Sequence, residues 1–330
     1  MNIFYFIFLF FFHPIAIAFS IPLTSPLPDG KQKNEKAEAT NIVFKSADGG
    51  QTWQDISDGL PDNSEDGPMS DGVFANEGGL YLRAGNQIYH SKPNSTAPFW
   101  EEAIFPGESS TTTAGQNGIA YHYDGHFLQK SNGTSVWSPV YTSFKRRNLN
   151  AVFETAGGTV FIGTNDGLFR SVDKGKNWKQ VYTRGWGTKL VESNGVLMAT
   201  SQNGILRSTD DGENWDCVLY EGGVAIALER IKGGFATINY NTLSMTRRVR
   251  TSFDDGKTWQ AIDAGLPANL SMASIIQVGE NFFCGHPDGI YRSSDMGKTW
   301  KLLLPSVEGK VFNLSVSGNV IYAIPRNGGC

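Results

Sequence analysis

Short apolar segments alternate with turn residues along most of the chain. In residues 150–182 the apolar segment NAVFETAGG ends in two glycines, TVFIGT follows, the turn NDG leads into GLFRS, and NWKQVY ends the unit. Alternating apolar segments joined by Asn/Asp-Gly turns predict antiparallel strands connected by hairpins. The pattern therefore predicts a four-stranded antiparallel unit of about 40 residues, which is typical of a propeller blade.

A polar turn motif, S-x-D-x-G-x-x-W, recurs between the third and fourth predicted strands. Five copies are clear: SADGGQTW at 46, SVDKGKNW at 171, STDDGENW at 208, SFDDGKTW at 252 and SSDMGKTW at 293. Two degenerate copies pair Ser91 with Trp100 and Ser131 with Trp137. The serines are then 45, 40, 40, 37, 44 and 41 residues apart, and seven of the eight tryptophans stand in the motif. This regularity indicates an internal repeat.

The two ends of the repeat region complement each other. One strand-like segment, NIVFKS, precedes the first motif, whereas two, VFNLSVSG and NVIYAIP, follow the last complete unit. Together they predict one blade made from both ends of the chain. We therefore expect an all-β fold: a seven-bladed β-propeller with four-stranded antiparallel blades over residues 41–330, closed by N- and C-terminal strands that share one blade. Such closure removes exposed sheet edges.

The N-terminal segment, MNIFYFIFLFFFHPIAIAFS, is unlike the rest of the sequence. Its apolar run is followed by small residues, which predicts a cleaved signal peptide over residues 1–18. The run is short and is interrupted by His13-Pro14, which disfavours a membrane span, although an uncleaved anchor is the alternative. Residues 19–40 form a polar linker. These features predict a secreted protein, extracellular or periplasmic, without a stable membrane span after cleavage.

The repeated motif resembles the Asp-box, or BNR, repeat of sialidases, sortilin-type receptors, xyloglucan-cleaving glycosidases and the photosystem II assembly factor family. The last is closest in architecture, being seven-bladed, box-bearing and non-catalytic. The resemblance covers nearly all of residues 41–330 and implies the propeller fold. It implies little about activity, because the box recurs in proteins of unrelated function.

The box residues are expected to stabilise the turn. The aspartate can accept bonds from backbone N–H groups, the glycine permits a positive φ, and the tryptophan can cover the gap between sheets. A calcium loop is disfavoured, because each box has one or two carboxylates and lacks a distal Glu. No metal or cofactor is predicted. The expected structural residues are Ser46, Asp48, Gly50, Trp53, Ser171, Asp173, Gly175, Trp178, Ser208, Asp210, Gly212, Trp215, Ser252, Asp254, Gly256, Trp259, Ser293, Asp295, Gly297 and Trp300.

Composition narrows the possible partners. The chain is 18% charged, has a net charge of -4 and contains no basic run, so a nucleic-acid partner is not expected. Its three cysteines do not form a disulfide framework. Cys217 and Cys284 lie in apolar segments and are expected to be buried. We expect a monomer.

Candidate binding residues lie in the loops opposite the boxes. Arg146 and Arg147 are adjacent in TSFKRRNLN, and Arg184 and Trp186 follow in the equivalent loop of the next blade. Arginines beside an aromatic ring suit a carboxylate, a sugar or an acidic protein. The alternative is solvated loop charge with a tryptophan that fills its own loop. A long connection between second and third strands, INYNTLSMTRRVRTS, adds three further arginines: Arg247, Arg248 and Arg250. Insertions on a scaffold often carry recognition, and the alternative is charge on the face of a strand.

Catalysis is the rival hypothesis, as a glycoside hydrolase of sialidase-like descent of the exo-α-sialidase type. It would need two carboxyl groups about 5–9.5 Å apart. The weak candidates are Asp124, Asp166, Asp263 and Asp288, of which all but Asp263 lie in Asp-Gly turns that hairpin geometry explains. The early Arg-Ile-Pro motif of sialidases is missing, and the resemblance implies six blades for those enzymes. The sequence thus favours an exported, non-catalytic propeller that binds a protein or glycan through its loop face.

Overall fold

The computed structural model describes residues 41–61, 73–84, 87–103, 112–114, 119–122, 126–130, 137–141, 149–185, 187 and 189–327. They lie within one compact unit, Ala37–Cys330. The regular elements in these ranges are β-strands. A search of the same ranges for a helix long and apolar enough to cross a membrane finds none.

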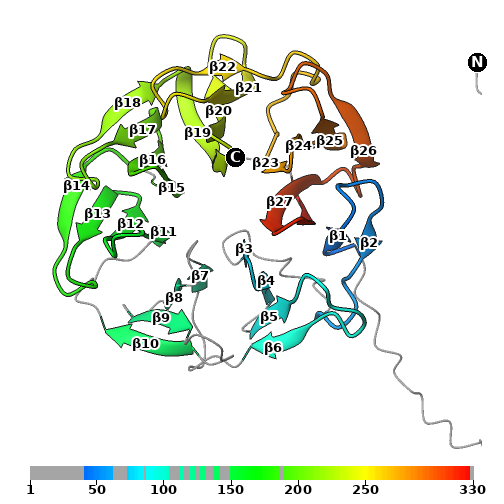
Figure 1. Ribbon diagram of the computed structural model, residues 1–330, viewed down its shortest axis with the longest axis horizontal. Coiled ribbons are helices and arrows are strands. Elements are labelled where there is room, and N and C mark those ends of the chain that lie inside the picture. Colours follow the sequence, from blue (N-terminus) through cyan, green and yellow to red (C-terminus); the bar gives the residue numbers. More distant parts are fainter. Residues whose placement is uncertain are drawn as a thin grey trace, which may run out of the picture. The chain divides into compact units, whose positions relative to one another are not determined.

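The described strands form seven four-stranded antiparallel sheets (Figure 1). Six of them follow chain order: β3 (Val73–Asn76), β4 (Gly79–Ala84), β5 (Gln87–Ser91) and β6 (Glu101–Ala103); β7 (Thr112–Ala114), β8 (Ile119–His122), β9 (His126–Lys130) and β10 (Trp137–Tyr141); β11 (Leu149–Glu154), β12 (Val160–Thr164), β13 (Gly167–Ser171) and β14 (Lys179–Tyr182); β15 (Leu190–Ser193), β16 (Val196–Ser201), β17 (Gly204–Ser208) and β18 (Asp216–Leu219); β19 (Gly222–Ile231), β20 (Gly234–Asn241), β21 (Thr246–Ser252) and β22 (Gln260–Ala261); and β23 (Ser274–Val278), β24 (Asn281–His286), β25 (Gly289–Ser293) and β26 (Lys301–Pro305).

The remaining sheet combines the two ends of the described chain, in the order β2 (Gln54–Asp55), β1 (Phe44–Ser46), β28 (Val320–Arg326) and β27 (Val311–Ser317). Phe44 pairs with Ala323 and Ser46 with Ile321 in antiparallel register. Figure 1 shows β27 and the first strand of each of the other six sheets near the centre, whereas β2 and the fourth strands of the other sheets lie at the rim. The predicted all-β propeller with four-stranded antiparallel blades is therefore confirmed.

The core lies between neighbouring sheets. The second strands β12 and β16 are buried along their whole length, whereas the outer strands β2 and β22 are exposed. One apolar cluster joins Phe161 of β12 to Leu197 and Leu206 of the next sheet. Middle strands covered on both faces need nearly continuous apolar sequence, which explains segments such as VFIGT and VLMATS.

All five clear boxes fold in the same way. The serine hydroxyl donates to the aspartate Oδ1 at 2.7–2.9 Å and accepts the glycine N–H at 2.8–3.0 Å. The aspartate also accepts the N–H of the residue four positions later at 2.9–3.0 Å. Each box glycine has a φ between 78° and 81°, as the turn requires.

The box also presses against the preceding sheet. A Cβ on Gly212 would lie 2.3 Å from Cζ of Phe161, and one on Gly256 would lie 2.7 Å from Cε of Met198. Trp215 packs edge-on against Phe161, with ring centroids 6.0 Å apart. The box is therefore both a turn and a contact between blades.

The structure corrects the expectation for one cysteine. Cys284 is buried, but Cys217 is exposed on the outer strand β18, where its thiol donates to the Asn203 carbonyl at 3.1 Å. Outer strands have one open flank, so an apolar segment there does not ensure burial. Cys330 lies outside the described residues.

Candidate binding face

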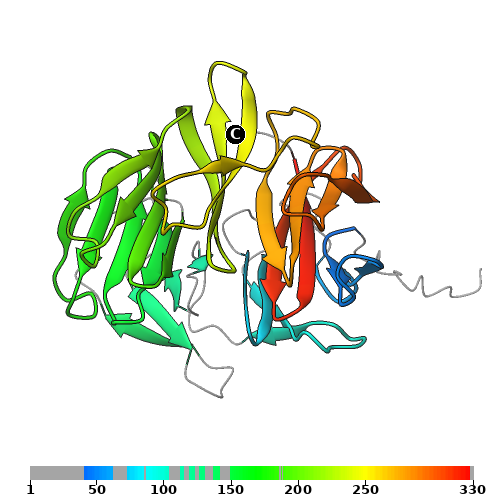
Figure 2. The ribbon, with the colours of Figure 1, turned by 45° about the horizontal axis from the view of Figure 1, so that its top comes forward.

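We use the term loop face for the side of the propeller formed by the turns between second and third strands and by the connections that follow each fourth strand. Among the described residues, the hairpin of β20 and β21 projects from this face, and Figure 2 shows it in yellow above the neighbouring sheets. In β12–β13 the pairing ends at Thr164 and Gly167. In β20–β21 the corresponding pair, Asn239 and Arg248, is followed by two further pairs before the chain turns.

Large apolar side chains are exposed around the tip of this hairpin. Leu243 is 94% exposed and Met245 58%. Tyr220 and Leu270 are exposed on either side. Their neighbours Glu221 and Asn269 hold the hairpin through carbonyls that accept the N–H groups of Thr242 and Arg247. We call Tyr220, Leu243, Met245 and Leu270 the hairpin patch.

Beneath the patch, two arginines of β21 meet a buried carboxylate. Arg248 donates to both oxygens of Asp263, from Nε at 2.7 Å and from Nη2 at 3.0 Å. Arg250 lies between Asp263, 3.7 Å away, and Glu221, 2.5 Å away. Burial opposes ionisation of Asp263, but the hydrogen bonds from Arg248 and the Val249 N–H and the charges of both arginines together lower its pKa. This carboxyl is held ionised.

Asp263 has an equivalent residue in the first repeat unit. The segments WQDISDGLP and WQAIDAGLP align Ser57 with Asp263. The Ser57 hydroxyl accepts the Val43 N–H at 3.0 Å, and the Asp263 carboxylate accepts the Val249 N–H at 2.9 Å. Both side chains accept a backbone N–H of the third strand or of the residue directly before it. Asp263 adds the two arginine contacts, which Ser57 lacks.

The other sequence-predicted binding residues are not all brought together. Arg247 is 4% exposed and donates to the Met272 carbonyl at 2.6 Å, so its side chain lies inside the fold. Arg184 is exposed, and the following Gly185 carbonyl accepts the Gln202 N–H at 3.2 Å. Arg146, Arg147 and Trp186 lie outside the described residues, as does the candidate acid Asp124.

The remaining candidate acids stand on separate turns. Asp166 is exposed, and its carbonyl accepts a bond from Gln180 at 2.9 Å. Asp288 is exposed and accepts the Tyr291 hydroxyl at 3.3 Å. Beside it, His286 is buried, its Nδ1 faces the Asp288 N–H at 3.1 Å and its Nε2 faces the Pro267 carbonyl at 3.0 Å. Burial lowers the pKa of His286 despite both neighbours, which favours the neutral ring. Within the described ranges, no group of three His, Cys, Asp or Glu side chains is arranged to hold a metal ion.

Comparison with known proteins supports the repeat and the fold. Residues 168–181 and 290–303 match the family model of the BNR-Asp box repeat. No curated protein sequence matches the chain. The extracellular domain of a putative one component system from B. thetaiotaomicron is similar in structure, with a TM-score of 0.52 and 11% identity over 79% of this chain and 39% of that one.

Two enzymes share the architecture to a similar degree. Virginiamycin B lyase from Staphylococcus aureus has a TM-score of 0.56 and 11% identity, over 78% of this chain and 97% of that one. An ancestral GH74 enzyme has a TM-score of 0.53 and 12% identity, over 80% of this chain and 48% of that one. This chain spans 39% and 38% of the length of two B. thetaiotaomicron extracellular domains. At these identities the likeness shows the propeller fold alone.

Proposed function

We propose that this chain is an exported, non-catalytic recognition propeller that acts as a monomer and binds a protein or a glycan through its loop face. The hairpin patch is the observation that carries the proposal. It combines Leu243 and Met245, at the tip of a hairpin that is longer than its counterparts in β12–β13, β16–β17 and β24–β25, with Tyr220 and Leu270 on the connections that follow β18 and β22. An exposed apolar cluster rimmed by polar groups marks an interaction site.

The chemistry of the patch favours a protein over a sugar. Leu243 and Met245 are aliphatic and flexible, and Met in particular adapts to irregular apolar surfaces. Arg248 lies beneath the patch and its side chain is 35% exposed. A partner surface that combines apolar residues with a carboxylate would complement both features.

The described acids favour a non-catalytic role. A general acid for glycoside cleavage needs a raised pKa, whereas that of Asp263 is lowered. The guanidinium of Arg250 stands between Asp263 and Glu221, where a substrate would have to bind. The glycoside hydrolase hypothesis remains the rival that the experiment must separate.

Export is the second part of the proposal. Residues 1–18 would be removed as a signal peptide, residues 19–40 would serve as a linker, and residues 41–330 would form the propeller in an extracellular or periplasmic location. The apolar leader supports it, as does the fold that the chain shares with extracellular domains of B. thetaiotaomicron. Mass spectrometry of the N-terminus of the exported protein tests it, and an intact Met1 on that protein would contradict it.

We further propose that the sheets close one ring of seven blades. The pairing of β1 with β28 and the contacts of innermost strands β27 with β3, β3 with β7 and β7 with β11 support this arrangement. A six-bladed ring would leave one of the sheets outside it. An experimental density map with six blades around the axis would contradict the proposal.

The binding role is tested with purified protein on a glycan array, in affinity capture from the exported-protein fraction, and against fluorogenic sialosides and other glycosides. A partner identified by capture should bind with a measurable Kd and lose at least about tenfold in affinity in Leu243→Ser/Met245→Ser. Arg184→Ala changes a loop-face residue distant in sequence from the hairpin patch, and its Kd for the partner is measured as well. Turnover of a glycoside that Asp263→Asn abolishes would overturn the non-catalytic assignment.

A further inference from the structure

The residue before the box serine reaches across to the next sheet. Arg170 donates from Nε to the Asp211 carbonyl at 2.8 Å, and Arg207 donates from Nε to the Asp255 carbonyl at 2.7 Å. Arg292 donates from Nη1 to the Gly49 carbonyl at 3.4 Å. The three acceptors occupy the same, fourth position of the facing box. These interfaces can therefore be compared position by position.

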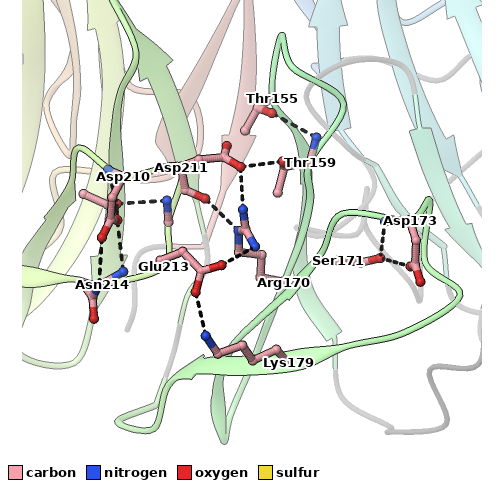
Figure 3. A network of polar contacts seen from close by, with 12 residues as sticks. Thr155, Thr159, Arg170, Ser171, Asp173, Lys179, Asp210, Asp211, Glu213 and Asn214 are labelled. Carbon is pink, nitrogen blue, oxygen red and sulfur yellow. Dashed lines mark hydrogen bonds and ion pairs between the residues drawn. The ribbon is translucent and has the colours of Figure 1, made fainter.

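At the first interface a carboxylate lies between two cations (Figure 3). The Glu213 side chain accepts from Arg170 Nη1 at 2.7 Å and from Lys179 Nζ at 2.6 Å. Arg170 also donates from Nη2 to the Asp211 carboxylate at 2.6 Å. Lys179 directly follows the box tryptophan of its own unit. The two positive charges on one sheet thus meet two negative charges on the next box.

At the third interface the same cations face a box that has no acid at the two positions equivalent to Asp211 and Glu213. Arg292 precedes the box serine and Lys301 follows the box tryptophan, as Arg170 and Lys179 do. The facing box has Gly49 and Gln51 where the first interface has Asp211 and Glu213. Among the described residues, the ion pairs include neither Arg292 nor Lys301.

The interface of Arg207 does not have this imbalance. There the position after the tryptophan holds Asp216, and the facing box holds Asp255 and Lys257. By sequence position, two positive residues are matched by two negative ones. The Arg292 interface has two positive residues and no negative one at the four corresponding positions.

The unmatched cations also border an open space. A groove of about 490 Å³ is lined by Gln51, Arg292, Lys301, Leu302 and Leu303. Leu302 is 39% exposed and provides an apolar wall beside the charges. The groove lies on the side of the boxes and is independent of the hairpin patch.

We propose that this groove binds the carboxylate side chain of an acidic peptide segment on a partner protein. The bound carboxylate would take the place that Glu213 fills at the first interface, between a guanidinium and an ammonium group. Charge-assisted bonds from these donors are strong and directional. The apolar wall favours a peptide, whose acidic residue has neighbours that Leu302 can contact, over a fully polar acidic sugar.

The test is fluorescence anisotropy of a fluorescein-labelled hexaglutamate peptide with the purified protein at low ionic strength. We expect saturable binding that weakens with added salt. Gln51→Glu should restore the internal carboxylate and weaken peptide binding about tenfold. The double variant Arg292→Gln/Lys301→Gln should weaken it at least as much. Because Gln51 is exposed, Gln51→Glu should keep a normal Tm.

Two further variants make the test specific. Lys257→Gln removes one positive charge at the box position equivalent to Gln51 and should leave peptide binding unchanged. Asp211→Gly/Glu213→Gln copies Gly49 and Gln51 of the third interface, leaves Arg170 and Lys179 without these carboxylates, and should create a second peptide site, which doubles the stoichiometry. Equal losses in Lys257→Gln and Gln51→Glu would attribute binding to net charge and overturn the proposal.

Other outcomes of the binding experiment also test the proposed peptide site. Absence of saturable peptide binding, or unchanged binding in Gln51→Glu, overturns the site. If trigalacturonate binds in a Gln51-sensitive manner and hexaglutamate does not, the groove recognises an acidic sugar and the peptide assignment is wrong.

Discussion

At the scale of single residues, the box aspartates are surface carboxylates that strongly favour the ionised form. In all five, hydrogen bonds from the residue four positions later and from the box serine lower the pKa from 3.8 to about 2. Since the folded pKa lies below the unfolded one, each box contributes stability above about pH 4 that is lost as the pH falls toward 2. The boxes therefore make the fold sensitive to acid.

This sensitivity can be measured as Tm against pH. We expect a steep fall in Tm from about pH 4 to about pH 2, and a shallower fall in Asp210→Asn, because the amide does not titrate. Asp216→Asn, which removes an exposed aspartate outside the box, is the control and should retain the wild-type slope. Identical slopes in both variants would show that the boxes do not govern acid unfolding.

Box glycines face two demands that a pair of substitutions can separate. Gly195, in the turn between β15 and β16, and the box glycine Gly212 have φ values of 73° and 78°, but a Cβ on Gly195 would have no neighbour within 4 Å. Gly195→Ala should reduce the free energy of unfolding by about 1–2 kcal/mol through backbone strain alone. Gly212→Ala should lose about 1–3 kcal/mol more, because the new methyl group meets Phe161. Urea unfolding measures both, and equal losses would contradict the contact between blades.

At the scale of elements, β21 shows how one repeat unit departs from the others. Where the first unit has Phe44 in β1 and Ile42 two residues before that strand, β21 has Arg250 and Arg248. These charges are accommodated because Asp263 replaces Ser57 and Glu221 lies on the other side of Arg250. The apolar contact of one sheet has become an ion-pair cluster in another, under the hairpin patch.

Single and double substitutions in this ion-pair cluster should change the free energy of unfolding by different amounts. Asp263→Ser leaves Arg248 and Arg250 without this partner and should reduce the free energy of unfolding by about 3 kcal/mol. Arg248→Ile/Asp263→Ser copies the pair Ile42 and Ser57 and should lose less than Asp263→Ser alone. Chemical denaturation of the single and double variants checks this. A double variant that loses the sum of the two single effects would show that the residues are not coupled.

At the same scale, the sequence predicts one feature of the candidate binding face and does not predict two others. The unusual length of the β20–β21 connection is visible in the sequence and locates the hairpin. The burial of Arg247 is not visible there, because adjacent arginines on a strand point to opposite faces and the covering loop at Asn269–Met272 comes from a distant segment. The exposure of Leu243 and Met245 likewise depends on the hairpin extending past its neighbours.

At the scale of the whole molecule, the two ends of the described chain are held in one sheet. β1 pairs with β28, and among the described strands β2 pairs with β1 alone, so β1 and β2 depend on β27 and β28 for their attachment. Val43, Tyr322 and Ile324 lie in one buried cluster that includes residues from the next sheet. Loss of either end would expose this cluster.

Truncation tests that dependence. Removal of residues 311–330 should abolish cooperative thermal unfolding or lower the Tm by more than about 10 °C, because a whole blade is lost. Removal of residues 1–18, the predicted signal peptide, is the control and should leave the Tm unchanged. A truncated protein with the wild-type Tm would contradict closure through the shared sheet.

The sequence by itself determined the repeat, the blades and the conformation of each box, because these depend on strand periodicity and on turn chemistry within about ten residues. Only the tertiary structure decided which side chains of consecutive blades face each other. Glu213 stands between Arg170 and Lys179, Gln51 stands opposite Arg292 and Lys301, and Arg247 is covered by the loop that leads from β22 to β23. Such contacts join residues more than 20 positions apart. Which of these residues face each other depends on how whole sheets pack, and local sequence patterns carry no information about that packing.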